Sequence, residues 1–253
     1  MSKITFGYIV GGEDKHYNNL LRSLESLERI EQPYEVVILD ADSRLEADED
    51  KPNVRIIPFP VDEAKGEGWF KPHYWQMRYH LNKFVETEYC FYMDTDTVIV
   101  NDRVDELIEE AGEDFLICRH WWVPELKDYL SRVRVNIGLV SHLIEEDKVD
   151  IPYFASGLFL FQKDKHDHIF DTYHKKFDSV FASIPNNAEG ITDELLLCLT
   201  LEETGGYKTT NGSMNHSSEQ EQMPLKFNEN DKTFWGKNPQ DDIYKKVFAF
   251  HND

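Results

Sequence analysis

The stretch Cys90–Val100, which reads CFYMDTDTVIV, places the tightest limit on how this chain can fold. Two apolar runs, Tyr89–Met93 and Val98–Val100, enclose Asp94 and Asp96. An apolar run this short, with aromatic and β-branched residues, predicts a strand that is buried on both faces. Because side chains alternate along an extended chain, Asp94 and Asp96 are expected to point the same way.

The aspartate pair predicts a metal site. Two carboxylates held together at the end of a buried strand repel each other unless a positive group lies between them. A hard divalent cation with oxygen ligands satisfies both carboxylates at once. The alternative interpretation is a polar β-turn that contains two aspartates and binds nothing. Few such turns directly follow a fully apolar strand, so we favour Asp94 and Asp96 as metal ligands.

The composition limits the partners of the chain. With 253 residues, 40% of them hydrophobic, it can bury a substantial core. A net charge of -21 opposes binding to nucleic acid or anionic membranes, so a phosphate-bearing substrate would need a metal. We find no stretch near the roughly 20 apolar residues of a membrane span, and no secretory signal. Three cysteines inside apolar segments suit a reducing, cytoplasmic location and give no zinc spacing.

The first half of the chain alternates strands with helices. Strands are expected at Ile4–Val10, Glu35–Leu39 and Asn53–Phe59, before the one that ends at Asp94. Helices are expected where apolar residues recur at helical spacing: Leu20, Leu21, Leu24, Leu27 and Ile30, and then Phe70, Tyr74, Met77, Leu81 and Phe84. This order predicts an α/β fold with a mostly parallel central sheet flanked by helices. Ligands of such sheets bind beyond the carboxyl ends of the strands, where Gly11, Asp40 and Asp94 fall.

The second half is less regular. Helices are expected over residues 102–111, 164–183 and 191–203, and strands over Phe115–Cys118, Tyr153–Phe161 and Val247–Phe250. Residues 206–246 are polar and are expected to be mostly loop. The histidines at 166, 168 and 174 are expected on the solvated side of their helix. No repeat or low-complexity linker divides the sequence, which predicts a single domain over residues 1–253.

Four motifs together resemble one enzyme family. The DxD triplet Asp94–Asp96 resembles that of nucleotide-sugar glycosyltransferases with the GT-A fold, which is Rossmann-like. YFASGLFLF looks like a strand of the glycogenin-like and lipopolysaccharide galactosyltransferase groups, although Ala155 stands where asparagine is commoner. TDELLL resembles the acidic pair that opens their following helix, and KVFAFH resembles the late strand whose histidine completes their metal site. The motifs occur in the family's order along almost the whole chain.

The resemblance implies a metal-dependent hexosyltransferase that moves a sugar from a nucleoside-diphosphate sugar, most often UDP-linked, to a carbohydrate or glycoconjugate acceptor. Residues 1–100 would form the donor-binding half and residues 101–253 the acceptor-binding half. His251 would be the third metal ligand, and imidazole beside carboxylates favours Mn²⁺ over Mg²⁺. Asp193 and Glu194 would face the sugar as catalytic carboxylates, while helix capping explains them without catalysis. The strongest motifs resemble retaining families.

Further residues are candidates for binding the donor. Asp40 could accept a hydrogen bond from the base or the ribose, and Lys71 could meet a phosphate. The ordinary alternatives are a loop-initiating aspartate, a surface lysine and a plain strand-to-helix turn at the glycines. The predicted donor-binding set is Val10, Gly11, Gly12, Tyr17, Asp40, Lys71, Ser156 and Gly157.

Two other function classes fit part of the sequence. FYMDTDTV also fits the opening motif of haloacid dehalogenase-like phosphotransferases, in which Asp94 would be the nucleophile. In those proteins the motif usually lies on the first strand, whereas two or three strands come first here. Ala155, in place of the commoner asparagine, keeps a non-catalytic nucleotide-sugar binder possible.

Overall fold

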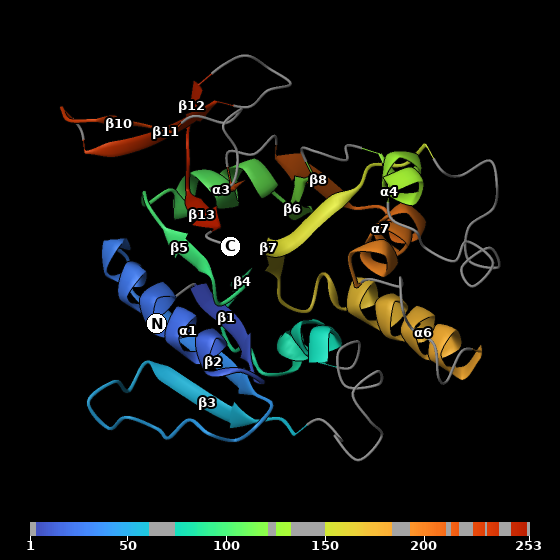
Figure 1. Ribbon diagram of the computed structural model, residues 1–253, viewed down its shortest axis with the longest axis horizontal. Helices are drawn as coiled ribbons and strands as arrows, with labels where there is room; N and C mark the ends of the chain where they lie inside the picture. The colour runs from blue at the N-terminus through green and yellow to red at the C-terminus, as the bar shows by residue number, and fades with distance from the viewer. Residues whose placement is uncertain are drawn as a thin grey trace.

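A computed structural model describes residues 4–60, 74–120, 125–132, 150–183, 193–210, 214–217, 225–230, 232–237 and 244–251. Lys71, a predicted phosphate contact, lies outside the described residues. Figure 1 shows a central sheet with helices packed on both of its faces.

The central sheet has seven strands in the order β3-β2-β1-β4-β7-β6-β8. Strand β7 runs antiparallel to both of its neighbours, and the other pairs are parallel. The prediction of an α/β fold with a mostly parallel sheet is therefore confirmed. The strands are β1 (Ile4–Val10), β2 (Tyr34–Asp40), β3 (Val54–Pro58), β4 (Tyr89–Met93), β6 (Phe115–Arg119), β7 (Phe154–Gln162) and β8 (Tyr207–Thr210).

Helices cover the sheet in two groups, each with its own apolar cluster. The helices are α1 (Asp14–Ser26), η1 (Leu27–Arg29), η3 (Gln76–Lys83), α3 (Val104–Ala111), α4 (Leu126–Arg132), α6 (Asp167–Ser183) and α7 (Asp193–Thr204). Helices α1, η1 and α3 contribute to one cluster, and η3, α4, α6 and α7 to the other. The three cysteines are free and buried in these clusters. Among the described helices, none has the length and apolar character needed to cross a bilayer.

Two smaller sheets contain the other six described strands. One has the order β5-β13-β9, and the other, which projects at the upper left of Figure 1, has the order β10-β11-β12. Residues 206–246, expected to be loop-rich, contain five short strands in the part that the structure describes. Strands of three to five residues give too little periodicity to detect in the sequence. Their bounds are β5 (Thr97–Ile99), β9 (Asn215–Ser217), β10 (Leu225–Asn228), β11 (Thr233–Lys237), β12 (Tyr244–Lys246) and β13 (Ala249–His251).

The inward face of α1 differs from the expected leucine stripe. Leu20 is buried, but Leu21 is 55% exposed. Ser23 is buried instead, and its hydroxyl bonds the Tyr8 hydroxyl at 3.1 Å and also donates to the Thr97 carbonyl. A serine with these partners can face the core at little cost, so α1 is rotated away from the orientation that apolar residues alone suggest.

The segment before β4 also differs in detail. The residues described there begin at Tyr74, and Gln76–Lys83 form a 3₁₀ helix rather than the expected α-helix. The Arg78 Nε donates to the Trp75 carbonyl at 3.2 Å, so a side chain takes up an acceptor of the helical ladder. His166, expected on a solvated face, is 2% exposed, and its Nδ1 accepts from the Gln162 amide at 2.9 Å.

Two stacked histidines join η3 to α6. The rings of His80 and His174 lie 4.1 Å apart, and the His174 Nε2 donates to the Tyr79 carbonyl at 3.1 Å. Burial, with smaller contributions from the charges of His174 and Lys83, lowers the pKa of His80 to about 3. Burial also lowers the pKa of His174.

We expect this pair to make stability sensitive to acid. The unfolded chain binds a proton at His80 below its ordinary pKa, near 6.5, while the folded chain does so only near 3. Stability should therefore fall as pH decreases through that window. The variant His80→Phe keeps a ring in the stack, so its melting temperature should drop less than that of the wild type between pH 7 and pH 5. Parallel curves for the two proteins would show that His80 does not carry this dependence.

Candidate functional site

The predicted metal ligands lie in a turn between two strands. Asp94 directly follows β4, and its carbonyl accepts from the Thr97 amide at 3.0 Å, where β5 begins. The expectation that Asp94 and Asp96 lie in an extended segment, and point the same way for that reason, is therefore wrong. A reversal of the chain, and not strand geometry, keeps the two residues close. The Asp94 amide donates to the Gly157 carbonyl at 2.8 Å, which fixes the turn against β7.

A buried arginine from η3 connects this turn with the second half of the chain. Arg78 is 5% exposed. One of its terminal nitrogens lies 3.5 Å from the Asp94 carboxylate and 3.4 Å from that of Asp193. The guanidinium also lies over the Tyr92 ring, 4.8 Å from its centroid, and the Tyr92 hydroxyl donates to Asp94. Arg78 thus supplies the positive charge that two partly buried carboxylates require.

Strand β7 delivers Ser156 to the same place through an irregularity in its pairing. Ile117 of β6 pairs with Phe159, whereas Cys118 pairs with Ala155, so the register shifts at this point. Such bulges redirect side chains next to functional sites. The Ser156 hydroxyl lies 2.9 Å from an Arg78 nitrogen and 3.1 Å from the Asp193 carboxylate.

Asp193 and Glu194 are the first two residues of α7, as the sequence predicts. The Tyr153 hydroxyl donates to Glu194 at 2.8 Å, and the Ser156 amide donates to it at 3.3 Å. The Tyr79 hydroxyl lies 3.5 Å from the Asp193 carboxylate. Side chains from η3, β7 and α7 therefore converge on one acidic pair.

Burial gives the two carboxyl groups different protonation behaviour. Burial and, to a smaller extent, the charge of Asp193 raise the pKa of Glu194 to about 7. Burial also raises the pKa of Asp193, but the Arg78 guanidinium opposes this shift. Burial acts to lower the pKa of Arg78, yet Asp193 and Asp94 hold it well above its ordinary value. Glu194 can therefore exchange a proton near neutral pH, while Arg78 stays charged.

At the ends of β1 and β2, Asp40 acts as a support for the neighbouring loop. It is 0% exposed, and its two oxygens accept from the Tyr17 hydroxyl at 2.9 Å and the Leu45 amide at 2.7 Å. The predicted contact of Asp40 with a base or ribose stays a prediction, since its carboxylate here faces protein groups. Asp42 is nearer the surface, and it accepts from the Gly12 amide at 2.8 Å.

The first glycine of the pair after β1 is tightly enclosed. A Cβ at Gly11 would lie 2.7 Å from the Ala41 Cβ and 3.0 Å from the Tyr74 ring, so a larger residue would displace its neighbours. Gly12 has a φ of +80°, which favours glycine. Val10, by contrast, is fully buried. The predicted donor contacts of these residues, like those of Ser156 and Gly157, remain predictions.

His251 is placed by its backbone. Strand β13 pairs antiparallel with β5, and His251 faces Thr97, the residue after Asp96. Within the described part of the chain, no three histidine, cysteine, aspartate or glutamate side chains come together as a metal site. Carboxylate oxygens from Asp94 and Asp96 are nonetheless the donors that Mg²⁺ and Mn²⁺ accept. The predicted metal ligands therefore fit the chemistry but stay predictions.

Sequence reasoning missed the residue at the centre of the site. Arg78 lies four residues after Tyr74 and three before Leu81, both of which belong to the predicted apolar stripe. A basic residue at the edge of a buried stripe signals a buried counter-charge. The sequence pattern likewise predicts only a strand at Tyr153 and does not indicate that its hydroxyl donates to Glu194.

The fold belongs to a class that known glycosyltransferases share. Neither a protein-family model nor a curated protein sequence matches the chain. A structure of galactosyltransferase LgtC with donor and acceptor sugar analogs matches 98% of this chain and 86% of LgtC, with a TM-score of 0.58 and 13% identity. An active-site mutant of LgtC matches the same shares, with a TM-score of 0.59 and 14% identity.

A second solved glycosyltransferase shares part of its structure with the chain. GlyE of Streptococcus pneumoniae TIGR4 matches 84% of this chain but only 46% of its own length, with a TM-score of 0.50 and 14% identity. At such identities the likeness concerns the fold. The glycosyltransferase fold predicted from the four motifs is therefore confirmed.

Proposed function

We propose that this chain is a metal-dependent glycosyltransferase that moves a sugar from a nucleoside-diphosphate sugar, most often UDP-linked, to a carbohydrate or glycoconjugate acceptor. The observation that carries this proposal is the position of Arg78 between Asp94 and Asp193, within the fold of LgtC. This arrangement gathers carboxylates from both halves of the chain at one edge of the sheet. LgtC has been solved with donor and acceptor sugar analogs, which supports transfer between a sugar donor and an acceptor.

In this proposal the chain works as one domain, with residues 1–100 binding the donor and residues 101–253 binding the acceptor. Asp94 and Asp96, with His251, would hold Mn²⁺ or Mg²⁺. When bound, the cation would offset the charge of the diphosphate, which an acidic protein otherwise repels. Arg78 keeps Asp94 and Asp193 oriented before any ligand arrives.

The proposed chemistry breaks the bond between the anomeric carbon and the diphosphate oxygen and forms a bond to an acceptor hydroxyl. Asp193 would face the anomeric carbon and stabilise the positive charge that develops there. Glu194, with a pKa of about 7, can take the proton that the acceptor hydroxyl loses. We propose retention of configuration, as in the families that the motifs resemble.

A donor screen tests this function. Purified protein is incubated with individual nucleotide sugars and Mn²⁺, Mg²⁺ or excess chelator, and released nucleotide is measured. We expect release from one donor with a metal, no release in chelator, and loss of release in Asp96→Asn. The control Asp105→Asn changes an exposed residue of α3 and should retain activity. Full activity in chelator would contradict metal dependence.

The same samples separate the alternatives. A nucleotide sugar that raises the melting temperature but releases no nucleotide with any acceptor would indicate a non-catalytic binder. Hydrolysis of a phosphate monoester that depends on Asp94 would indicate the phosphotransferase. The structure does not favour that alternative, since the motif follows the fourth strand of the chain.

A further inference from the structure

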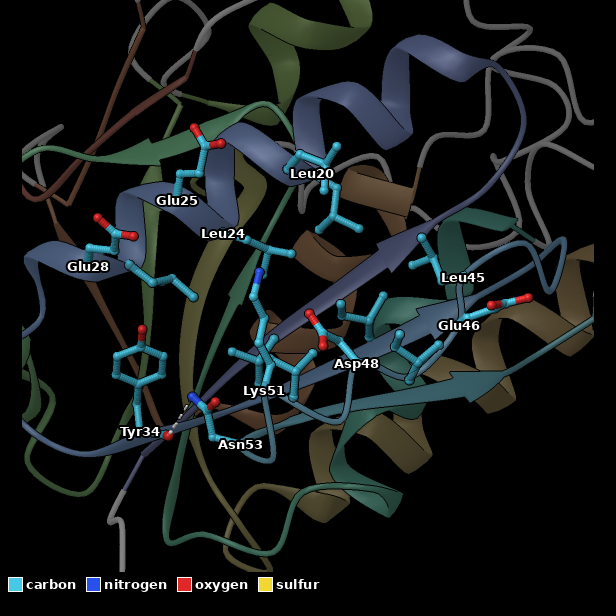
Figure 2. Close-up of a pocket in the computed structure, with 16 residues that line it drawn as sticks. Leu20, Leu24, Glu25, Glu28, Tyr34, Leu45, Glu46, Asp48, Lys51 and Asn53 are labelled. Atoms are coloured by element: carbon cyan, nitrogen blue, oxygen red, sulfur yellow. Dashed lines mark hydrogen bonds between the residues drawn. The ribbon is translucent and has the colours of Figure 1, made fainter.

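A second recess lies apart from the carboxylates at Asp94 and Asp193. Its volume is about 420 Å³, and it lies between α1 and the face of β2 and β3, beneath the loop that joins these strands. Figure 2 shows this α1–β3 pocket. None of the predicted metal, catalytic or donor-binding residues lines it, although Leu45, whose amide donates to Asp40, does.

The floor of the α1–β3 pocket is apolar. Leu20 comes from α1, and Val36 and Ile38 come from β2, each 1% exposed. Leu21 also lines the pocket, but its side chain is 55% exposed to solvent. A single exposed leucine is common on protein surfaces, but Leu21 adjoins the apolar floor of the recess and extends its apolar surface. An occupant that fills only the recess would leave Leu21 uncovered.

The mouth of the pocket is acidic on two sides. Glu25 and Glu28 stand on the helical side, and Glu46 and Asp48 stand on the loop side (Figure 2). All four are exposed. Lys51 also lines the pocket and supplies one positive charge among these four carboxylates. Carboxylates on opposite sides match several positive charges spread along a chain better than they match one ammonium group.

We propose that the α1–β3 pocket receives a basic amphipathic segment of a partner protein. Apolar side chains of that segment enter the recess and cover Leu21, while its lysines or arginines pair with the carboxylates on both sides. Amphipathic segments are commonly bound in apolar grooves in this way. The acidic mouth opposes an anionic membrane as the occupant.

A labelled synthetic peptide with leucine and lysine at helical spacing tests the proposal by fluorescence anisotropy. The probe should bind the wild type, and the same peptide with glutamate in place of lysine should not. Charge reversal by Glu25→Lys with Glu46→Lys should weaken binding at least about tenfold. The exposed substitution Leu21→Gln, which leaves the fold intact, should weaken it in the same direction.

A matched pair separates this pocket from general attraction to an acidic protein. Glu109→Lys with Glu202→Lys makes the same change of net charge at exposed positions on α3 and α7. We expect less than about a twofold effect from this control. Equal weakening in both pairs, or no binding by the wild type, would overturn the proposal. It would also be overturned if decylamine bound at the pocket and the peptide did not, because the site would then take a small cationic amphiphile.

Discussion

Replacing Arg78 by methionine should lower the free energy of unfolding by about 3–5 kcal/mol, since it leaves the largely buried Asp193 and the partly buried Asp94 without their counter-charge. Asp94 and Asp193 both lie within 3.5 Å of this guanidinium, and the Ser156 hydroxyl also loses a donor. Thermal unfolding at pH 8 in the presence of chelator measures the change. We expect a melting temperature roughly 10 °C lower than that of the wild type.

Two comparisons make the result specific. Arg78→Lys keeps the charge but loses the planar fork, so its loss of stability should be smaller. If Asp94 is a metal ligand, Mn²⁺ should restore more stability to Arg78→Met than it adds to the wild type, because the cation supplies the missing charge. A change below about 1 kcal/mol in Arg78→Met would show that the carboxylates are solvated or protonated and do not need Arg78.

The amide variants of the acidic pair should separate binding from turnover. Asp193→Asn and Glu194→Gln should still bind the donor but reduce kcat at least about a hundredfold, the usual scale for a missing acid–base or charge-stabilising group. Wild-type kcat should rise with pH through about 7, because Glu194 must be ionised to accept a proton. Glu194→Gln should lack this limb of the profile.

The alternative interpretation, in which the two carboxylates only cap the start of α7, predicts a different result for the same two variants. If Asp193 and Glu194 only begin α7, the variants should melt at a changed temperature and keep kcat within a few-fold of the wild type. Donor affinity, measured by calorimetry, serves as the control for an intact site. A change in KM alone would place these side chains in binding and not in proton transfer.

The sequence was informative where a local pattern determines the structure. An apolar run that ends in aspartate is sufficient to predict β4 and the position of Asp94, because both follow from a few adjacent residues. The start of α7 at Asp193 was visible for the same reason. Periodicity and helix-capping preferences act over short distances, so they can be read without knowing the fold.

The rest depends on contacts between distant segments. Arg78 meets Asp193 and Ser156 only once η3, α7 and β7 have packed together, and no spacing rule connects these positions. The inward turn of Ser23 likewise depends on Tyr8 and Thr97 from two other strands. A polar residue can be buried when it has hydrogen-bond partners, and these partners often lie far away in the sequence, where local patterns do not reveal them.

The pairing of β13 with β5 has a consequence for the order in which the protein forms during synthesis. The segment that follows Asp96 takes its antiparallel partner from Ala249–His251, so more than half of the printed sequence separates the two strands. Strands β1 to β4 can associate on the ribosome as soon as they emerge. Strand β5, which follows the turn at Asp94 and Asp96, can pair with β13 only after residue 251 has been synthesised. A nascent chain would therefore begin to form its central sheet before the segment beside Asp94 and Asp96 had its strand partner.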